Sequence, residues 1–179
     1  MQTHLVLAVI GRDRPGLVNA VSETVTAGGG NWLETRMASL AGQFAGILHV
    51  VVSADRADGL IAALQKLEAQ GLRLIIEKTG EMGPAFGQAM RLELIGLDRP
   101  GIVRDISRVL AAQNVSIAEL ATEQVSASFS GEVMFKAQAR LRLPEGLDVE
   151  QLRRSLEDLA SEMMVDLELE TDGALGQAA

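Results

Sequence analysis

The sequence predicts an α+β protein made of two consecutive copies of one β-α-β-β-α-β unit. A segment that occurs twice carries this prediction, because 9–18 (VIGRDRPGLV) recurs as 94–103 (LIGLDRPGIV) at an offset of 85 residues. Apolar residues with strand and helix periods also follow in the same order in each half. The offset predicts two units of roughly 80 to 90 residues each.

The first half begins with an apolar run over 3–10, which is typical of a central strand. A helix is then expected near Pro15, because proline suits the first helical position, where a missing N–H costs nothing. Glycines 28–30 end that helix, and they precede Asn-Trp rather than the Lys-Ser/Thr of a phosphate loop. The apolar stripe of this helix consists of Val18, Val21 and Val25.

Two strands and a second helix complete the first half. The pattern predicts strands over 31–40 and 42–52, with a hairpin turn at Gly42-Gln43. A helix follows from Asp55 or Asp58 and ends before Gly71. Alternation over 72–77 then predicts a fourth strand with one wetter face.

The second half repeats this order of elements. The predicted elements are a strand over 90–94, a helix over 100–110, a strand over 115–122, a polar loop over 126–131, a strand over 133–143, a helix over 149–159 and a strand over 165–169. Right-handed crossovers make two ferredoxin-like units, each an antiparallel four-stranded sheet with two helices on one face. We therefore expect domains at 1–79 and 89–171, a linker at 80–88 and a disordered tail at 172–179. The other face of each sheet is left for the other half, or another chain, to cover.

Composition excludes several kinds of partner. The chain has 16 basic and 24 acidic residues, and its net charge of −8 opposes both nucleic acid and anionic membranes. No apolar run reaches the ~20 residues of a membrane span, and residues 1–4 do not resemble a secretory leader. Four Phe, one Trp and no Tyr leave little for base stacking. We expect a cytoplasmic protein that binds no nucleic acid directly and no membrane.

The repeated loop has the chemistry to bind a small amino acid. A helix N-terminus exposes unpaired N–H groups to a carboxylate, Gly16 and Gly101 allow close approach, and an aspartate attracts an ammonium group. An asparagine at the start of the second strand of each half both donates and accepts hydrogen bonds. The alternative is that Asp-Arg-Pro-Gly only ends a strand and starts a helix, and that each asparagine is only a turn residue. The candidate ligand-binding residues are Gly11, Asp13, Arg14, Pro15, Gly16, Asn31, Asp98, Pro100, Gly101 and Asn114.

Other chemistry finds little support in the sequence. The chain has no cysteine, and no Gly-x-Ser-x-Gly elbow or carboxylate pair is evident, so we predict no enzyme, no catalytic residue and no cofactor. His4 and His49 are interpreted as structural residues rather than metal ligands. Trp32 is expected in a core or an interface rather than a ligand pocket.

The motif Gly-x-Asp-Arg-Pro-Gly-Leu/Ile-Val, followed by Asn at a strand start, resembles the ACT domain family. This resemblance spans nearly the whole chain as two tandem units, and it implies amino-acid binding at the Pro-Gly loop and the Asn, often between units. Residues 31–38 (NWLETRMA) with 42–46 (GQFAG) more specifically resemble the glycine cleavage repressor family. Residues 129–131 (FSG) match 44–46 (FAG) at the same offset.

The resemblance implies a non-catalytic regulator that senses a small amino acid, with glycine as a candidate. It would act on transcription through a DNA-binding activator as its protein partner, as a homodimer or higher oligomer. The alternative is a scaffold whose ACT units only associate. The copies differ, since Leu97 replaces Arg12 and Val115-Ser116 follow Asn114 where Trp32-Leu33 follow Asn31. The two sites need not share a ligand, and the first copy is the one to test first.

Overall fold

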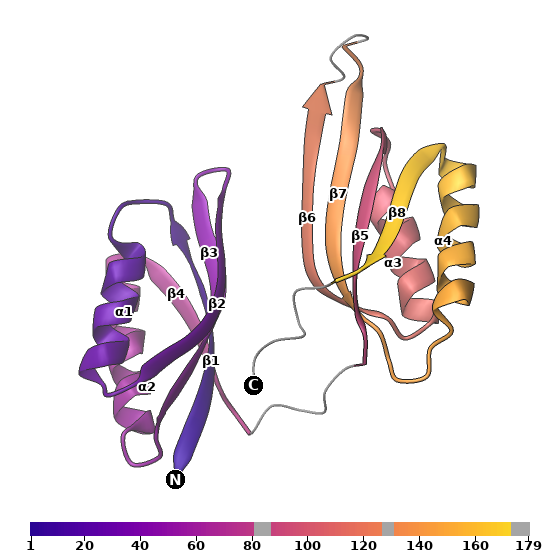
Figure 1. Ribbon diagram of the computed structural model, residues 1–179. Helices are drawn as coiled ribbons and strands as arrows, with labels where there is room; N and C mark the ends of the chain where they lie inside the picture. The colour runs from indigo at the N-terminus through magenta and orange to yellow at the C-terminus, as the bar shows by residue number, and fades with distance from the viewer. Residues whose placement is uncertain (81–86, 127–130, 173–179) are drawn as a thin grey trace. The chain divides into compact units, whose positions relative to one another are not determined.

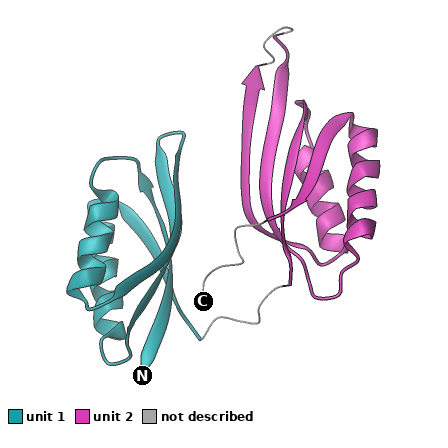
Figure 2. Ribbon diagram, in the orientation of Figure 1, with its two compact units in different colours: residues 1–83 teal, residues 84–179 magenta. Residues whose placement is uncertain are grey.

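The computed structural model describes residues 1–80, 87–126 and 131–172 of the chain. The chain divides into two compact units, Met1–Gly83 (unit 1) and Pro84–Ala179 (unit 2), shown separately coloured in Figure 2. Most of the predicted linker (81–86) and of the predicted tail (173–179) lies outside the described residues.

Each unit has the predicted β-α-β-β-α-β order (Figure 1). Unit 1 consists of β1 (Gln2–Arg12), α1 (Leu17–Ala27), β2 (Asn31–Leu40), β3 (Gln43–Ser53), α2 (Ala57–Gln65), a 3₁₀ segment (Lys66–Gln70) and β4 (Leu72–Thr79). Unit 2 consists of β5 (Ala89–Leu97), α3 (Ile102–Ala112), β6 (Ser116–Ser126), β7 (Val133–Arg142), α4 (Val149–Met163) and β8 (Val165–Thr171). The α+β class and the tandem repeat are confirmed.

The two sheets share one topology. Their strand orders are β2-β3-β1-β4 and β6-β7-β5-β8, and every adjacent pair is antiparallel. Two helices cover one face of each sheet (Figure 1). This is the ferredoxin-like arrangement that the sequence predicts. Since β1 and β2 both pair with β3, they run parallel to each other and start at the same end of the sheet.

Each unit has its own apolar core between sheet and helices. Strand β1 contributes alternate residues, Leu5, Leu7 and Val9, at 0–2% exposure. In unit 2, Leu92 and Leu94 occupy the corresponding places on β5. Among the described residues, no polar or charged residue is buried. In each unit, the alternate apolar residues of the strands pack against the apolar stripes of the helices, and this burial stabilises the unit.

The prediction that proline occupies the first helical position is wrong in both copies. Helix α1 begins at Leu17 and α3 at Ile102, and the residue before each is a left-handed glycine. Gly16 has φ 91° and Gly101 has φ 100°. A left-handed residue cannot continue a right-handed helix, so the preceding proline lies in the turn that leads to it.

The β2–β3 hairpin turns one residue earlier than predicted. Ala41 and Gly42 occupy the turn with φ 49° and 76°, and Leu40 pairs with Gln43. Two positive φ values in a two-residue loop define a type I′ turn, whose twist matches that of the flanking strands. Gln43 is therefore the first residue of β3, because the strand twist decides which residues form the turn.

We expect the two units to unfold independently. Leu7→Ala should lower the unfolding free energy of unit 1 by about 2–5 kcal/mol, because it leaves a cavity in a closed core. The equivalent Leu92→Ala should leave that transition unchanged within about 0.5 kcal/mol. Trp32, the only tryptophan of the chain, reports on unit 1 in urea unfolding. Equal shifts of the Trp32 transition in the two variants would show one cooperative unit instead.

Candidate functional site

Hydrogen bonds tie the loop between β1 and α1 to two neighbouring segments. The Asp13 N–H donates to the Gly42 carbonyl at 2.9 Å, and the Ser39 hydroxyl donates to Asp13 Oδ2 at 2.7 Å. Arg14 Nη2 donates to the Gln70 carbonyl at 2.7 Å. The loop is thereby joined to the β2–β3 hairpin and to the chain entering β4.

The loop between β5 and α3 in unit 2 repeats the aspartate tie with different partners. The Asp98 N–H donates to the Val133 carbonyl at 3.0 Å, and Gln124 Nε2 donates to Asp98 Oδ2 at 2.5 Å. Gln124 stands at the same offset of 85 residues from Ser39. The aspartate that occurs in both copies of the motif therefore has a structural role, because its hydrogen bonds connect the loop to the neighbouring strands.

The first glycine of the motif has a packing role. A Cβ on Gly11 would lie 2.9 Å from Leu72 Cδ2 and 3.0 Å from the Gly71 carbonyl oxygen. A Cβ on Gly96 would likewise clash with Val165. These glycines let the central strand approach its edge neighbour, β4 or β8, closely.

The glycines at the two helix N-termini have different surroundings. A Cβ on Gly16 would meet no atom of the described residues within 4 Å, so these residues leave the space over the start of α1 open. A Cβ on Gly101 would lie 3.0 Å from Arg104 Nη2 and 3.7 Å from Asp105 Oδ2. The start of α3 is thus covered by side chains of its own first turn.

Arg104 and Asp105 form a two-point ion pair over that helix end. Arg104 Nε lies 2.9 Å from Asp105 Oδ1, and Nη2 lies 3.3 Å from Oδ2. The hydrogen bond from Arg104 lowers the pKa of Asp105, and the charges of Arg104, Arg108 and Arg99 act in the same direction. At the corresponding positions α1 has Asn19 and Ala20, and its first turn has no acidic residue.

The structure corrects the predicted place of Asn31. Asn31 pairs with Val51, which pairs with His4, at the start of β1. The Asp13–Gly16 loop follows Arg12, at the far end of that strand. Eight residues of strand separate the two positions by roughly 25 Å. Because β1 and β2 run parallel, Asn31 cannot contact a ligand at the loop of its own unit.

The structure also corrects the role assigned to Asn114, which does not open β6. Its backbone is left-handed, with φ 56°, and its N–H donates to Ala111 at 3.0 Å after the end of α3. Gly29 takes the same position after α1, with φ 75° and an N–H bond to Thr26 at 3.0 Å. Asparagine is tolerated there in place of glycine. By strand pairing, the counterpart of Asn31 is Ser116.

The two histidines form a pair that their separation in the sequence conceals. His4 Nδ1 and His49 Nε2 are 2.8 Å apart across β1 and β3, and the ring centroids are 5.0 Å apart. No group of three metal-ligating residues occurs in the described ranges. Trp32 packs against the core of unit 1, in agreement with its predicted core role.

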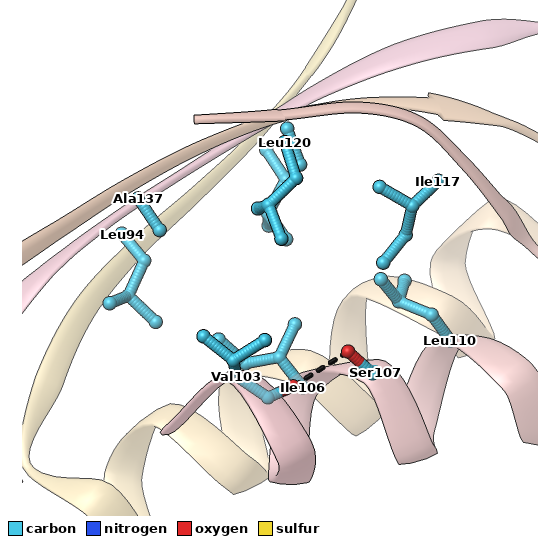
Figure 3. Close-up of a pocket in the computed structure, with 10 residues that line it drawn as sticks. Leu94, Val103, Ile106, Ser107, Leu110, Ile117, Leu120 and Ala137 are labelled. Atoms are coloured by element: carbon cyan, nitrogen blue, oxygen red, sulfur yellow. Dashed lines mark hydrogen bonds between the residues drawn. The ribbon is translucent and has the colours of Figure 1, made fainter. Parts of the chain in front are cut away.

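One small cavity in unit 2 lies between α3 and the sheet (Figure 3). Leu94, Ile106 and Leu120 are among its apolar lining residues, and its volume is about 20 Å³, room for about one water molecule. Its one side-chain polar group, the Ser107 hydroxyl, donates to the Val103 carbonyl at 2.6 Å. This cavity cannot accept the charged groups of an amino acid.

Fold and repeated loop together define a tandem α+β module. The ACT domain model matches residues 3–82 and 90–170, and the chain therefore belongs to the ACT domain family. It is 24% identical over 165 residues to the glycine cleavage system transcriptional repressor of Escherichia coli (strain K12), covering 90% of this chain and 86% of that protein. The Shigella flexneri repressor matches equally.

Two crystal structures share the fold along nearly the whole chain. A protein of unknown function from Galdieria sulphuraria has a TM-score of 0.85 at 29% identity, covering 96% of this chain and 99% of that one. A candidate glycine cleavage system transcriptional repressor has a TM-score of 0.71 at 21% identity, with coverages of 96% and 98%. None of the helices in the described ranges is long and apolar enough to cross a membrane.

Removing the guanidinium of Arg104 should raise the pKa of the Asp105 carboxyl toward the ordinary value of about 3.9. Because the pKa of Asp105 is lower in the folded state than in the unfolded state, its ionised carboxylate stabilises unit 2 at pH values above the unfolded-state pKa. This stabilisation is lost as pH falls through the folded-state pKa. We expect a clear upward shift in Arg104→Gln and a smaller one in Arg108→Gln, whose nitrogen is 3.9 Å away. Carboxyl ¹³C shifts in an NMR titration measure both. An equal or larger shift in Arg108→Gln would contradict the assignment.

Proposed function

We propose that this chain is a non-catalytic regulator that senses a small amino acid and controls glycine cleavage or related amino-acid metabolism through a protein partner. The observation that carries the proposal is the match to two ACT domains, together with likeness to the Escherichia coli repressor over 90% of the chain. The finer parts of the proposal, namely ligand, site and partner, rest on the geometry of the repeated loop and on charge.

The proposed ligand site is the N-terminus of α1 in unit 1. In the described part of the chain no side chain caps this helix by a hydrogen bond, and the space over Gly16 is open there to an incoming carboxylate. Asp13 lies in the same loop, where its negative charge would attract the ammonium group of an amino acid. Glycine is the first amino acid to test, because the chain is similar to the Escherichia coli glycine cleavage system transcriptional repressor over 90% of its length.

The equivalent loop in unit 2 is a weaker candidate. The carboxylate of Asp105 already lies near Gly101, where a ligand carboxylate would have to bind. A ligand would have to displace Asp105 from Arg104, and two negative charges repel at that distance. The proposal therefore assigns sensing to unit 1, and Asn31 would contribute only from another copy of that unit.

A protein partner follows from the electrostatics. The net charge of −8 opposes contact with the phosphate backbone, so control of transcription would pass through a DNA-binding activator. An amino acid regulates such a complex only if it binds the partner-competent and partner-incompetent states with different affinities.

A scaffold without effector binding is the second candidate function. Asp13 and Arg14 both make hydrogen bonds within unit 1, which explains their presence without any ligand. Under this alternative the open space over Gly16 would have no occupant.

Calorimetric titration with glycine and the other amino acids, with Trp32 fluorescence as a second signal, separates the two candidates. We expect saturable binding of at least one small amino acid, with one site per chain. The absence of heat and of any fluorescence change with every amino acid would exclude the sensor and leave the scaffold.

Transplanting the ion pair of unit 2 tests where the ligand binds. The double variant Asn19→Arg, Ala20→Asp should cover Gly16 and weaken binding at least ~10-fold, because its own carboxylate competes for the helix end. The matched variant Arg104→Asn, Asp105→Ala should leave the affinity of the unit 1 site unchanged. Unchanged affinity in the first variant would move the site elsewhere.

The purified chain should not bind DNA by itself. Repulsion from the phosphates predicts no shift of a promoter fragment in an electrophoretic assay at 50 mM salt, a condition that favours electrostatic binding. Tight binding that weakens steeply with added salt would contradict a partner-mediated mechanism.

A further inference from the structure

The open face of the unit 1 sheet, opposite α1 and α2, carries large apolar side chains. We call it the apolar face, and its apolar residues include Val6, Ala8, Ile10, Ala45, Ile47 and Ile75. Ile47 and Ile75 are 55% and 66% exposed. A shallow groove of about 570 Å³ runs over them, with Arg36 and Arg73 also in its lining. A contiguous apolar surface of this kind marks an interaction site in a water-soluble domain.

The same face of unit 2 is polar, although the fold is the same. By strand pairing, the unit 2 counterparts of Val6, Ala8, Ile47 and Ile75 are Arg91, Glu93, Gln138 and Glu168. Ion pairs cross this face, with Arg91–Glu93 at 2.8 Å and Arg140–Glu119 at 3.1 Å. The fold therefore does not require an apolar open face, and the apolar residues of unit 1 need another explanation.

We propose that the apolar face is a self-association surface, on which unit 1 of a second copy of the chain packs face to face. Two sheets packed in this way form an aligned sandwich about 10 Å thick, with strands within about 30° of each other. This inference does not depend on ligand binding, since Gly16 and its loop lie beyond the end of β1 rather than on the face.

Strand pairing divides the centre of the apolar face into three rows across β4, β1 and β3. The first row is Arg73, Ile10 and Ala45, the middle row is Ile75, Ala8 and Ile47, and the third row is Glu77, Val6 and His49. A two-fold axis along the middle row would place the first row of one copy over the third row of the other.

This orientation makes the face complementary to itself in charge and in size. Arg73 of each copy meets Glu77 of the other, and neither has an ion-pair partner among the residues that the structure describes. The larger His49 lies over the small Ala45, and Ile10 lies over Val6. Arg36 meets its own copy near the axis, where its charge is offset by Glu34 at 3.1 Å.

A two-fold axis along the strands is less favourable. In that orientation each row faces the same row of the other copy, and β4 lies over β2 of the other copy. Glu77 would then face Glu34, which already pairs with Arg36 of its own copy, and Arg73 would face Ala38, so neither Arg73 nor Glu77 would meet an opposite charge. Two carboxylates brought together out of water repel each other. The axis across the strands is therefore the one that we propose.

Sedimentation velocity over a range of protein concentrations tests the surface. The wild-type chain should be dimeric, and Ile47→Glu or Ile75→Glu should weaken association at least ~100-fold, because each places two like charges at the axis. Both side chains are exposed, so circular dichroism should remain unchanged. The control is Ile95→Glu, since Ile95 is 39% exposed and is the unit 2 counterpart of Ile10 on β5. It should leave association unchanged.

A charge exchange tests the orientation. Glu77→Arg alone and Arg73→Glu alone should each weaken association about 10-fold, and the double variant should restore it, because opposite charges again meet across the interface. Within one copy the two residues are four apart on β4, roughly 13 Å, so rescue reports a contact between copies.

Three results would overturn the proposal. A monomeric wild-type chain would mean that something other than a second copy covers the apolar face. A dimer that survives Ile47→Glu and Ile75→Glu would place the interface elsewhere. Failure of the double charge variant to restore association would exclude the proposed orientation.

Discussion

Both units depend on one constraint, that their helices cover a single face of each four-stranded sheet. The covered face becomes the core, where Leu7 and Leu92 occupy equivalent buried positions. Over the other face, the described residues of the same unit place no helix or strand. Unit 2 meets this constraint with ion pairs such as Arg140–Glu119, whereas unit 1 presents Ile47 and Ile75. The same backbone therefore provides one surface suited to water and one suited to a partner.

A second asymmetry lies at the helix N-termini. Helices α1 and α3 both begin after a left-handed glycine, and no side chain of a described residue caps either helix by a hydrogen bond. Unit 2 places its own carboxylate, Asp105, beside the positive end of α3, while unit 1 leaves that place open. Similar backbones thus carry unequal electrostatics at the two helix N-termini, and the ligand site that we propose is at the open end, on α1.

The loop that we propose as the ligand site is connected to the rest of unit 1 by hydrogen bonds. Asp13 joins it to the β2–β3 hairpin and Arg14 joins it to the chain before β4. A ligand that pulls on this loop would therefore act on both edge strands of the sheet. These hydrogen bonds would connect ligand binding at the helix N-terminus to the surface that a protein partner contacts. The connection regulates the partner only if the partner-competent and partner-incompetent states bind the ligand with different affinities.

The sequence by itself determined the fold class, the duplication and the element order, because periodicity and turn residues act locally along the chain. The sequence pattern predicted most strands and helices. The predicted helical position of Pro15 and the predicted hairpin turn at Gly42-Gln43 were wrong, because Gly16, Ala41 and Gly42 have left-handed backbone that the pattern does not reveal. Only the tertiary structure decided which residues of the motif meet. Asn31 lies at the far end of the sheet from Gly16, since parallel β1 and β2 start together, and Asn114 matches Gly29 rather than Asn31. Pairing register, which a single sequence does not record, also decided that Ile47, Ile75 and Ala8 share one face.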